Sequence, residues 1–292
     1  MKEQERVAPA GTSARLPTET DGTLPSFFIA GAMRSGTTSL TRYLDAHPEV
    51  FVSRPKEIHY FDVNYPKGID WYRGHFSTVA GEHAIGDATP SYMYLGDAVV
   101  RMAQAVPEAR IIALLRNPVD RAYSHYRLRR AVGAEQLDFV DAIAAELQRL
   151  ELGDPRRACP YLDMSRYVSQ LRHLCRHFRR EAVHVVIFEA LRDEPQHTYS
   201  EVCRFLGVDD TFVPPNLGQV VNASVTYRSM GLRKMRHRLP RPVWRVVGRL
   251  NTRRASYPPL DPALRAGLTE RFAQDNAELA AWLGHDLAMW ET

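Results

Sequence analysis

The stretch FFIAGAMRSGTTSLTRYLDAHPEV, residues 27–50, decides the fold class of the chain. An apolar run ends at Gly31, a short turn follows, and a helical pattern begins at Thr37. This order is typical of a strand that leads through a phosphate-binding loop into a helix. Gly31 and Gly36 have the spacing of the triphosphate loop G-x-x-x-x-G-K-[ST], but Thr37 stands where that loop has lysine. Because the lysine contacts the β- and γ-phosphates, its absence argues against a bound triphosphate.

The loop keeps the other features of an anion site. Backbone N–H groups and the positive end of the helix dipole face an anion at a helix N-terminus. The sequence adds hydroxyl donors and one cation, Arg34. We therefore expect a single phosphate in the loop, with Arg34 directed at a neighbouring oxygen. The expected contacts come from Arg34, Ser35, Gly36, Thr37, Thr38 and Ser39.

A second anion site is indicated by RIIALLRNPVDRAYSHY, residues 110–126. Asn117 followed by Pro118 is typical of a helix start. Arg116 then lies at the carboxyl end of the preceding strand, where ligands bind in open α/β sheets. Ser124 lies about two helical turns further on. An arginine and a hydroxyl can hold an isolated phosphate, so the two sites together predict a nucleotide with separate 5′ and 3′ phosphates.

Short apolar runs alternate with helical patterns along the chain. Strand patterns occupy residues 26–31, 83–88, 109–115 and 183–188. Helical patterns occupy residues 37–46, 117–130, 138–152, 165–180, 196–206 and 263–283. Strands separated by helices predict an α/β fold, in which one domain over residues 25–292 has a central, mainly parallel sheet flanked by helices.

The composition excludes several classes of protein. A content of 45% hydrophobic and 25% charged residues is ordinary for a globular chain of 292 residues. A net charge of +4 favours an anionic ligand only mildly and is too small to indicate nucleic acid. There is no apolar run long enough for a transmembrane helix. Cys159, Cys175 and Cys203 form no disulfide framework and no metal-ligand spacing, which favours a reducing cytoplasm and no bound metal.

The two ends of the chain differ from its middle. Residues 1–24 are polar and lack the apolar core of a signal peptide, so we expect a disordered tail. From Arg228 to Arg254 there are ten Lys or Arg residues and no Asp or Glu. We interpret residues 228–262 as a basic lid or an acceptor-side segment, although a solvated helix face fits the same pattern.

With these motifs in place, the chain resembles the sulfotransferases that use 3′-phosphoadenosine 5′-phosphosulfate (PAPS). It is most similar to the branch that includes heparan sulfate N- and O-sulfotransferases and their bacterial relatives. The resemblance covers about residues 25–290. It rests on five segments in order, GAMRSGTTSLTRYLDAHPEV, RPKEIHYFD (54–62), YPKGIDWY (65–72), GDATPSYMY (86–94) and RIIALLRNPVDRAYSHY.

The resemblance implies a role for each matching residue. Residues 34–39 surround the 5′-phosphosulfate, Arg116 and Ser124 bind the 3′-phosphate, and Glu57 is the general base. A basic loop of the family is loosely matched by Arg253 and Arg254. Where the family has a lysine in E-K-[ST]-P-x-Y, this chain has Ala88, which argues against a heparan-type acceptor.

The implied reaction is in-line transfer of a sulfuryl group from PAPS to a hydroxyl or amine, with release of adenosine 3′,5′-bisphosphate (PAP). A free glutamate titrates near 4.3, so Glu57 needs either partial burial or proton transfer late in the transition state to act as a base. His59 is the alternative base, or it orients Glu57. Lys56 pairs with Glu57 or contacts the sulfonate, and Asp62 and Asp87 are expected to contact the acceptor.

Three further expectations complete the analysis. His125 is expected on the surface of its helix. The acceptor is a small molecule, a lipid or a sugar, and the arginine- and alanine-rich, lysine-poor composition indicates a bacterial source. Two other functions stay open: a P-loop kinase, which would need ATP and Mg²⁺, and a non-catalytic module that binds a nucleotide or an anionic polymer, whose affinity would fall steeply with salt.

Overall fold

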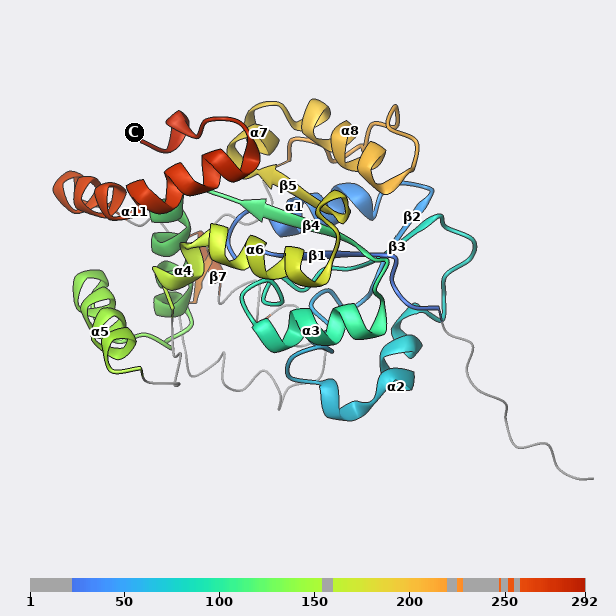
Figure 1. The fold of residues 1–292 in the computed structure, drawn as a ribbon, viewed down its shortest axis with the longest axis horizontal. Helices are drawn as coiled ribbons and strands as arrows, with labels where there is room; N and C mark the ends of the chain where they lie inside the picture. The colour runs from blue at the N-terminus through green and yellow to red at the C-terminus, as the bar shows by residue number, and fades with distance from the viewer. Residues whose placement is uncertain are drawn as a thin grey trace, which may run out of the picture.

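A five-stranded, all-parallel sheet forms the centre of the computed structural model (Figure 1). The structure describes residues 23–153, 160–219, 225–227, 247, 252–254 and 258–291. The strands are β1 (Phe27–Gly31), β2 (Val50–Val52), β3 (Ala84–Asp87), β4 (Arg110–Leu115) and β5 (Val183–Ile187), in the order β2-β3-β1-β4-β5. The predicted α/β fold with a parallel sheet flanked by helices is confirmed.

Helices cover both faces of this sheet. They are α1 (Thr37–Leu44), α2 (Ile69–Arg73), α3 (Gly96–Ala105), α4 (Pro118–Ala131), α5 (Phe139–Glu151), α6 (Tyr167–His177), α7 (Phe188–Asp193), α8 (Pro195–Leu206) and α11 (Pro262–Leu283). Single 3-10 turns occupy Tyr65–Lys67, Gly74–Phe76, Asp163–Ser165, Arg180–Ala182 and Ala288–Trp290. Every helix predicted from the sequence is present, with ends that differ by at most three residues.

Successive residues of the central strands point into two separate cores. Phe28 packs with α3 and α6, whereas Phe27 packs with α1 and α8 on the opposite face. Ile111 and Ile112 on β4 divide in the same way. This alternation is the period-2 geometry of a strand, and it explains why the strands read as continuous apolar runs.

The strand order reverses at β1, and this reversal positions the site. β3 pairs with one edge of β1 and β4 with the other. The loops that follow β1 and β4 therefore meet at the carboxyl ends of these strands, where α/β sheets bind ligands. A hydrogen bond of 2.7 Å from Ala32 N to Leu114 O ties the start of the loop after β1 to the end of β4.

Some predictions fall on residues outside the described ranges. These include nearly all of the predicted tail, Cys159 and most of the basic segment 228–262. Within that segment the structure describes residues 247, 252–254 and 258–262. Residues 252–254 form β7 (Thr252–Arg254), which pairs antiparallel with β6 (Val225–Tyr227), a strand just before the segment. Among the described helices, none has the length and apolar character needed to cross a membrane.

Candidate active site

A cavity of about 400 Å³ opens at the carboxyl ends of β1 and β4. Its lining combines the loop after β1, the start of α1, one side of α4 and the loop that carries Glu57. Eight predicted residues line it: Arg34, Gly36, Thr37, Thr38, Ser39, Glu57, Arg116 and Ser124. Ser35 is the exception in the loop, because its side chain is fully buried beneath it.

The loop after β1 has the shape of an anion cradle. Arg34 has φ 73° and Gly36 has φ 90°, both in the left-handed region that turns the chain sharply. A Cβ on Gly36 would lie 2.7 Å from Cδ2 of Phe188, so the position needs glycine for space as well as for conformation. Gly36 caps α1 without a side-chain hydrogen bond, and the first turn contains no acidic residue. The helix N-terminus is therefore open to an anion.

Cations from two elements converge over this cradle. Arg34 Nε donates to Ser124 Oγ at 3.1 Å, and Arg116 Nη1 donates to the Arg34 carbonyl at 3.4 Å. Burial lowers the pKa of Arg34, and the charges of Arg116 and Arg127 lower that pKa further. Asp120 offsets part of the charge, 3.8 Å from Arg116, but it also pairs with an arginine of α11. Mutual repulsion between these guanidinium groups is relieved when an anion binds.

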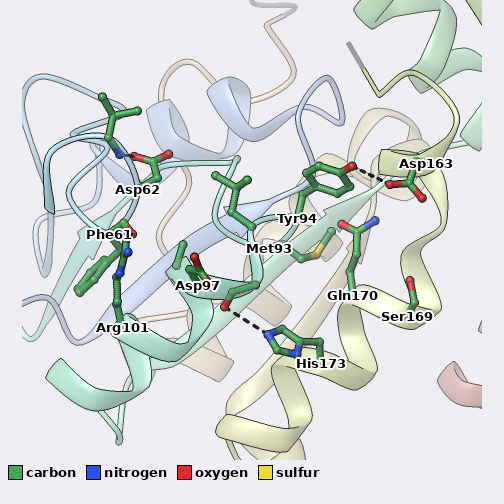
Figure 2. A pocket seen from close by; sticks show the side chains of 14 residues that line it. Phe61, Asp62, Met93, Tyr94, Asp97, Arg101, Asp163, Ser169, Gln170 and His173 are labelled. Carbon is green, nitrogen blue, oxygen red and sulfur yellow. Dashed lines mark hydrogen bonds between the residues drawn. The ribbon is translucent and has the colours of Figure 1, made fainter. Parts of the chain in front are cut away.

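A second cavity of about 810 Å³ lies on the other side of the loop after β3 (Figure 2). Pro90 lines the first cavity and Met93 lines the second, so the short segment between them separates the two. Asp62, which is predicted to contact the acceptor, lines the second cavity rather than the first.

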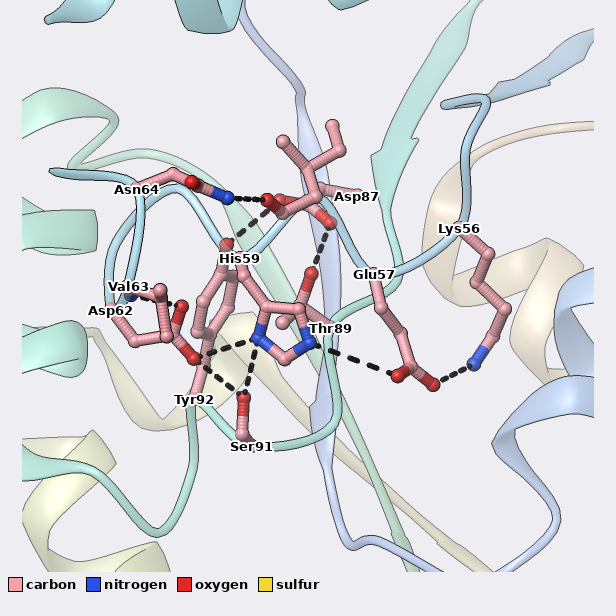
Figure 3. A network of polar contacts seen from close by, with 11 residues as sticks. Lys56, Glu57, His59, Asp62, Val63, Asn64, Asp87, Thr89, Ser91 and Tyr92 are labelled. Atoms are coloured by element: carbon pink, nitrogen blue, oxygen red, sulfur yellow. Dashed lines mark hydrogen bonds and ion pairs between the residues drawn. The ribbon is translucent and has the colours of Figure 1, made fainter. Parts of the chain in front are cut away.

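Glu57, His59 and Asp62 form a polar chain between the two cavities (Figure 3). His59 Nδ1 lies 2.9 Å from Asp62 Oδ2, and His59 Nε2 lies 3.8 Å from Glu57 Oε2. Lys56 Nζ lies 2.9 Å from Glu57 Oε1, and Ser91 Oγ donates to Asp62 Oδ2 at 2.9 Å. Glu57 and His59 both have positive φ, 62° and 55°, so the backbone is strained where the polar chain is built.

The charges in this chain set the protonation states. His59, and after it Lys56, lower the pKa of Glu57 to about 2 against the opposing effect of partial burial. Asp62, and after it Glu57, raise the pKa of His59 to about 10. At neutral pH, Glu57 is therefore a carboxylate and His59 an imidazolium with no free lone pair. Glu57 has the partial burial that a base needs, but the two adjacent cations outweigh its effect on the pKa.

Asp87 lies at the end of β3 but does not face either cavity. It is fully buried and accepts hydrogen bonds from Tyr72 Oη at 2.9 Å, Thr89 Oγ1 at 2.7 Å and Tyr92 Oη at 3.3 Å. Burial raises the pKa of Asp87 to about 6. This environment leaves no route for the predicted contact with an acceptor, and Asp87 instead anchors the loop that follows β3.

His125 is buried, in contrast to the surface position expected for it. It is 6% exposed and packs edge-on against Tyr161, with ring centroids 5.3 Å apart. Burial lowers the pKa of His125 to about 3, so it is neutral. Arg253 and Arg254 lie on β7, which pairs with β6, and β6 contacts α4.

The sequence analysis missed several residues of the first cavity. Arg127 follows Ser124 by three residues on α4, and that helical spacing was the signal that would have found it. Phe188 and Leu191 of α7 also line the cavity, and Arg116 stacks 4.9 Å above the Phe188 ring. The sequence analysis gave neither residue a role in the site, because α7 is brought there by the long-range pairing of β5 with β4.

Comparison with known proteins identifies the class that this fold and site define. A family model described as a sulfotransferase domain matches residues 24–230. The chain therefore belongs to the sulfotransferase family, and the prediction of the family is confirmed.

Individual relatives agree with this family. The chain is 31% identical over 282 residues to bifunctional heparan sulfate N-deacetylase/N-sulfotransferase 2 from Homo sapiens. This alignment covers 91% of this chain and 31% of the relative. It is 41% identical over 106 residues to membrane-associated sulfotransferase kil1 from Dictyostelium discoideum, covering 35% of this chain and 22% of the relative. A crystal structure of a sulfotransferase from Alicyclobacillus acidocaldarius matches 92% of this chain and 100% of that chain, with a TM-score of 0.72 and 30% identity. The chain thus spans about a third or less of these two curated relatives, and its predicted similarity to the heparan sulfate branch is confirmed.

Proposed function

We propose that the chain transfers a sulfuryl group from PAPS to a hydroxyl or amine and releases PAP. The observation that carries the proposal is the hydrogen bond from Arg34 to Ser124, which joins the loop after β1 to α4 in one basic cavity. An anion at the start of α1 and a second anion at Arg116 match the two phosphates of a 3′,5′-bisphosphorylated nucleotide. The similarity to an N-sulfotransferase supports sulfuryl transfer as the reaction.

In this proposal the donor is held at both ends. Backbone N–H groups at the start of α1, with Thr37, Thr38 and Ser39, bind the 5′-phosphosulfate. Arg116 and Ser124 bind the 3′-phosphate, and the buried Nε of Arg116, which has no hydrogen-bond partner among the described residues, provides an open donor. Arg34 lies between the two anions and stabilises the negative charge that develops on the leaving 5′-phosphate oxygen.

Glu57 is the proposed base. The bond from sulfur to the 5′-phosphate oxygen breaks as the bond from the acceptor oxygen or nitrogen to sulfur forms, and Glu57 takes the acceptor proton. His59 holds Glu57 in place as an imidazolium, and Asp62 fixes the ring from its other side. An imidazolium cannot accept a proton, which favours Glu57 over His59 as the base.

The remaining parts of the proposal concern setting and acceptor. Cys175 and Cys203 are free thiols, which supports the predicted reducing cytoplasm, and a bacterial source remains a prediction. A small-molecule, lipid or sugar acceptor is proposed. The basic segment 228–262, with Arg253 and Arg254, is proposed to lie over the donor or the acceptor.

Calorimetric titration tests the proposal directly. The ligands are PAP, which has a 3′- and a 5′-phosphate, adenosine 5′-monophosphate, which lacks the 3′-phosphate, and ATP with Mg²⁺, which has a 5′-triphosphate instead. We expect micromolar affinity for PAP and an affinity about 10- to 100-fold lower for the monophosphate, which lacks one charge-assisted phosphate contact. Tighter binding of ATP than of PAP would instead favour a kinase, and equal binding of all three would favour a non-specific anion site.

A further inference from the structure

The peptide group between Arg116 and Asn117 forms the turn from β4 into α4. Its carbonyl oxygen accepts a hydrogen bond from Tyr167 Oη at 2.9 Å, and its N–H donates to Glu189 Oε1 at 3.1 Å. Side chains of α6 and α7 therefore hold the same peptide group from both edges. Because the peptide plane cannot rotate freely, the direction in which the Arg116 side chain leaves the backbone is fixed.

Trp290 closes a ring of hydrogen bonds at this turn. Its indole Nε1 donates to Glu189 Oε2 at 3.1 Å, so each oxygen of that carboxylate holds one donor. Its carbonyl accepts from Asn117 Nδ2 at 3.1 Å, which joins the three residues pairwise. Figure 1 shows α7 and the turn after α11 beside the ends of β4 and β5. Asn117 and Trp290 are buried, so water competes little for these bonds.

Tyr167 supports the ring from the side of α6. It is buried and packs against Trp290, with ring centroids 6.1 Å apart. Burial raises the pKa of Tyr167 to about 12, so its hydroxyl keeps the proton that it donates to the Arg116 carbonyl. The aromatic pair therefore stabilises both hydrogen bonds to the peptide group.

The ring meets the donor cavity at Arg116. Of these residues, only Arg116 is among the described residues that line that cavity. Its guanidinium lies 4.9 Å from the centre of the Phe188 ring, and Phe188 directly precedes Glu189. One short helix, α7, thus supports both the side chain of this arginine and the peptide group that follows it.

We propose that Glu189 and Trp290 are positioning residues that give the donor cavity its selectivity for a 3′-phosphate. This inference rests on the proposed function, in which Arg116 binds that phosphate. A guanidinium matches a phosphate only in a narrow range of orientations, so its hydrogen bonds depend on a fixed backbone. The 5′-phosphate is held by the start of α1, outside the ring. Opening the ring should therefore weaken only ligands that carry a 3′-phosphate.

Two substitutions open the ring without changing its charge. Trp290→Phe removes the indole N–H and keeps an aromatic ring beside Tyr167. Asn117→Ser removes the bond to the Trp290 carbonyl and keeps a hydroxyl that can cap α4. Glu189 is left in place, because its replacement would also remove a negative charge that repels the phosphate.

Calorimetry with PAP and with adenosine 5′-monophosphate measures the selectivity of each variant. We expect each substitution to raise the Kd of PAP about 2- to 10-fold, the effect of one weakened hydrogen bond. The Kd of the monophosphate should stay within about twofold of the wild-type value, whereas a general loss of structure would weaken both nucleotides. Since the two substitutions break different bonds, either variant decides the question if the other fails to fold.

A background without the guanidinium shows whether the ring acts through Arg116. Adding Trp290→Phe to Arg116→Met should leave the Kd of PAP unchanged, because no guanidinium remains to be oriented. Trp282→Phe is the matched control and should change neither Kd. Trp282 packs against the same core as Trp290, but it lies under Arg180, 4.0 Å from the guanidinium to the ring centre.

Three results would overturn the inference. They are an unchanged Kd of PAP in either folded single variant, an equal rise for both nucleotides, and a further rise when Trp290→Phe is added to Arg116→Met. A wild type that binds PAP no more tightly than the monophosphate would overturn the 3′-phosphate site of the proposed function instead.

Discussion

Replacing Arg116 with methionine is expected to weaken PAP binding without weakening the fold. The guanidinium lies at the end of β4. Its Nε has no hydrogen-bond partner among the residues that the structure describes, and its other nitrogens make weak contacts. Two charge-assisted hydrogen bonds to a phosphate contribute about 1.5–3 kcal/mol each. Because Arg34 and Ser124 remain, we expect a net loss of about 2–3 kcal/mol, or a roughly 30- to 150-fold rise in the Kd of PAP.

Without ligand, the same substitution should stabilise the fold slightly or leave its free energy of unfolding unchanged. After burial, the charge of Arg116 is the largest cause that lowers the pKa of Arg34, so its removal relieves a repulsion. The lost stacking on Phe188, worth about 0.5–1 kcal/mol, is partly replaced by a sulfur–aromatic contact from methionine. The free energy of unfolding without ligand should therefore change by less than about 1 kcal/mol.

Thermal and urea unfolding with and without PAP separate these effects. At a PAP concentration of 100 times the wild-type Kd, ligand stabilisation is about 2.7 kcal/mol, and it falls to about 0.4 kcal/mol if the Kd rises 100-fold. Arg179→Met is the matched control, because Arg179 is 83% exposed and only pairs with Glu108 on the surface. A normal Kd in Arg116→Met would refute the placement of the 3′-phosphate. Loss of stability with normal PAP affinity would give Arg116 a structural role instead.

Glu57→Gln should lower kcat by about 10²- to 10⁴-fold with little change in the Kd of PAP, measured by product mass and calorimetry; wild-type turnover would place the base elsewhere. His59→Asn should change the pH dependence of stability. Because the pKa of His59 is raised, its contribution to the free energy of unfolding is fully present below about pH 6.5 and is lost as the pH rises through about 10. The free energy of unfolding of the wild type, measured in urea, should therefore decline over that pH window, and the decline should be smaller in the variant. Gly36→Ala should destabilise the protein by about 1–3 kcal/mol, because φ is 90° and Phe188 lies 2.7 Å from the new Cβ. Gly267→Ala on α11, where nothing lies within 4 Å, should instead stabilise by about 0.5–1 kcal/mol, and similar effects at both positions would contradict this argument.

The parts of the fold that the sequence predicted are those with dense local signals. Asn117 accepts from the N–H groups of Val119 and Asp120, as its place before Pro118 indicated. The missed elements lack such signals. β2 has three residues, and α3 begins at Gly96 without a capping side chain, so neither stands out from a turn. Their positions depend on pairing with β3 and packing against the core, which are long-range effects.

The candidate site shows the same division between local and long-range information. The loop residues and Arg116 line one cavity, as predicted, because the carboxyl ends of neighbouring parallel strands lie together. Protonation states depend on distances that a sequence does not contain. Asp87 was expected to contact the acceptor, yet Tyr72 and Tyr92 donate hydrogen bonds to it and it is fully buried.

The low pKa of Glu57 raises the question of how it becomes a base, and Lys56 offers an answer. In the proposed reaction the ammonium of Lys56, 2.9 Å from Glu57 in the free protein, has a second partner once the 5′-phosphosulfate is bound. If the ammonium moves toward that anion, Glu57 loses one of the two cations that lower its pKa, and its basicity rises only when the donor is present.

This order of events predicts that PAP raises the Glu57 pKa, and that Lys56→Met removes most of the PAP-induced change. The pKa of Glu57 in the free variant should lie above about 2 but below its ordinary value, because His59 remains the larger cause of the shift. Carboxyl ¹³C chemical shifts followed against pH, with Glu57→Gln for assignment, would measure both values. A PAP-induced shift of the same size in wild type and Lys56→Met would show that the donor acts on Glu57 directly, and that Lys56 holds the base without controlling it.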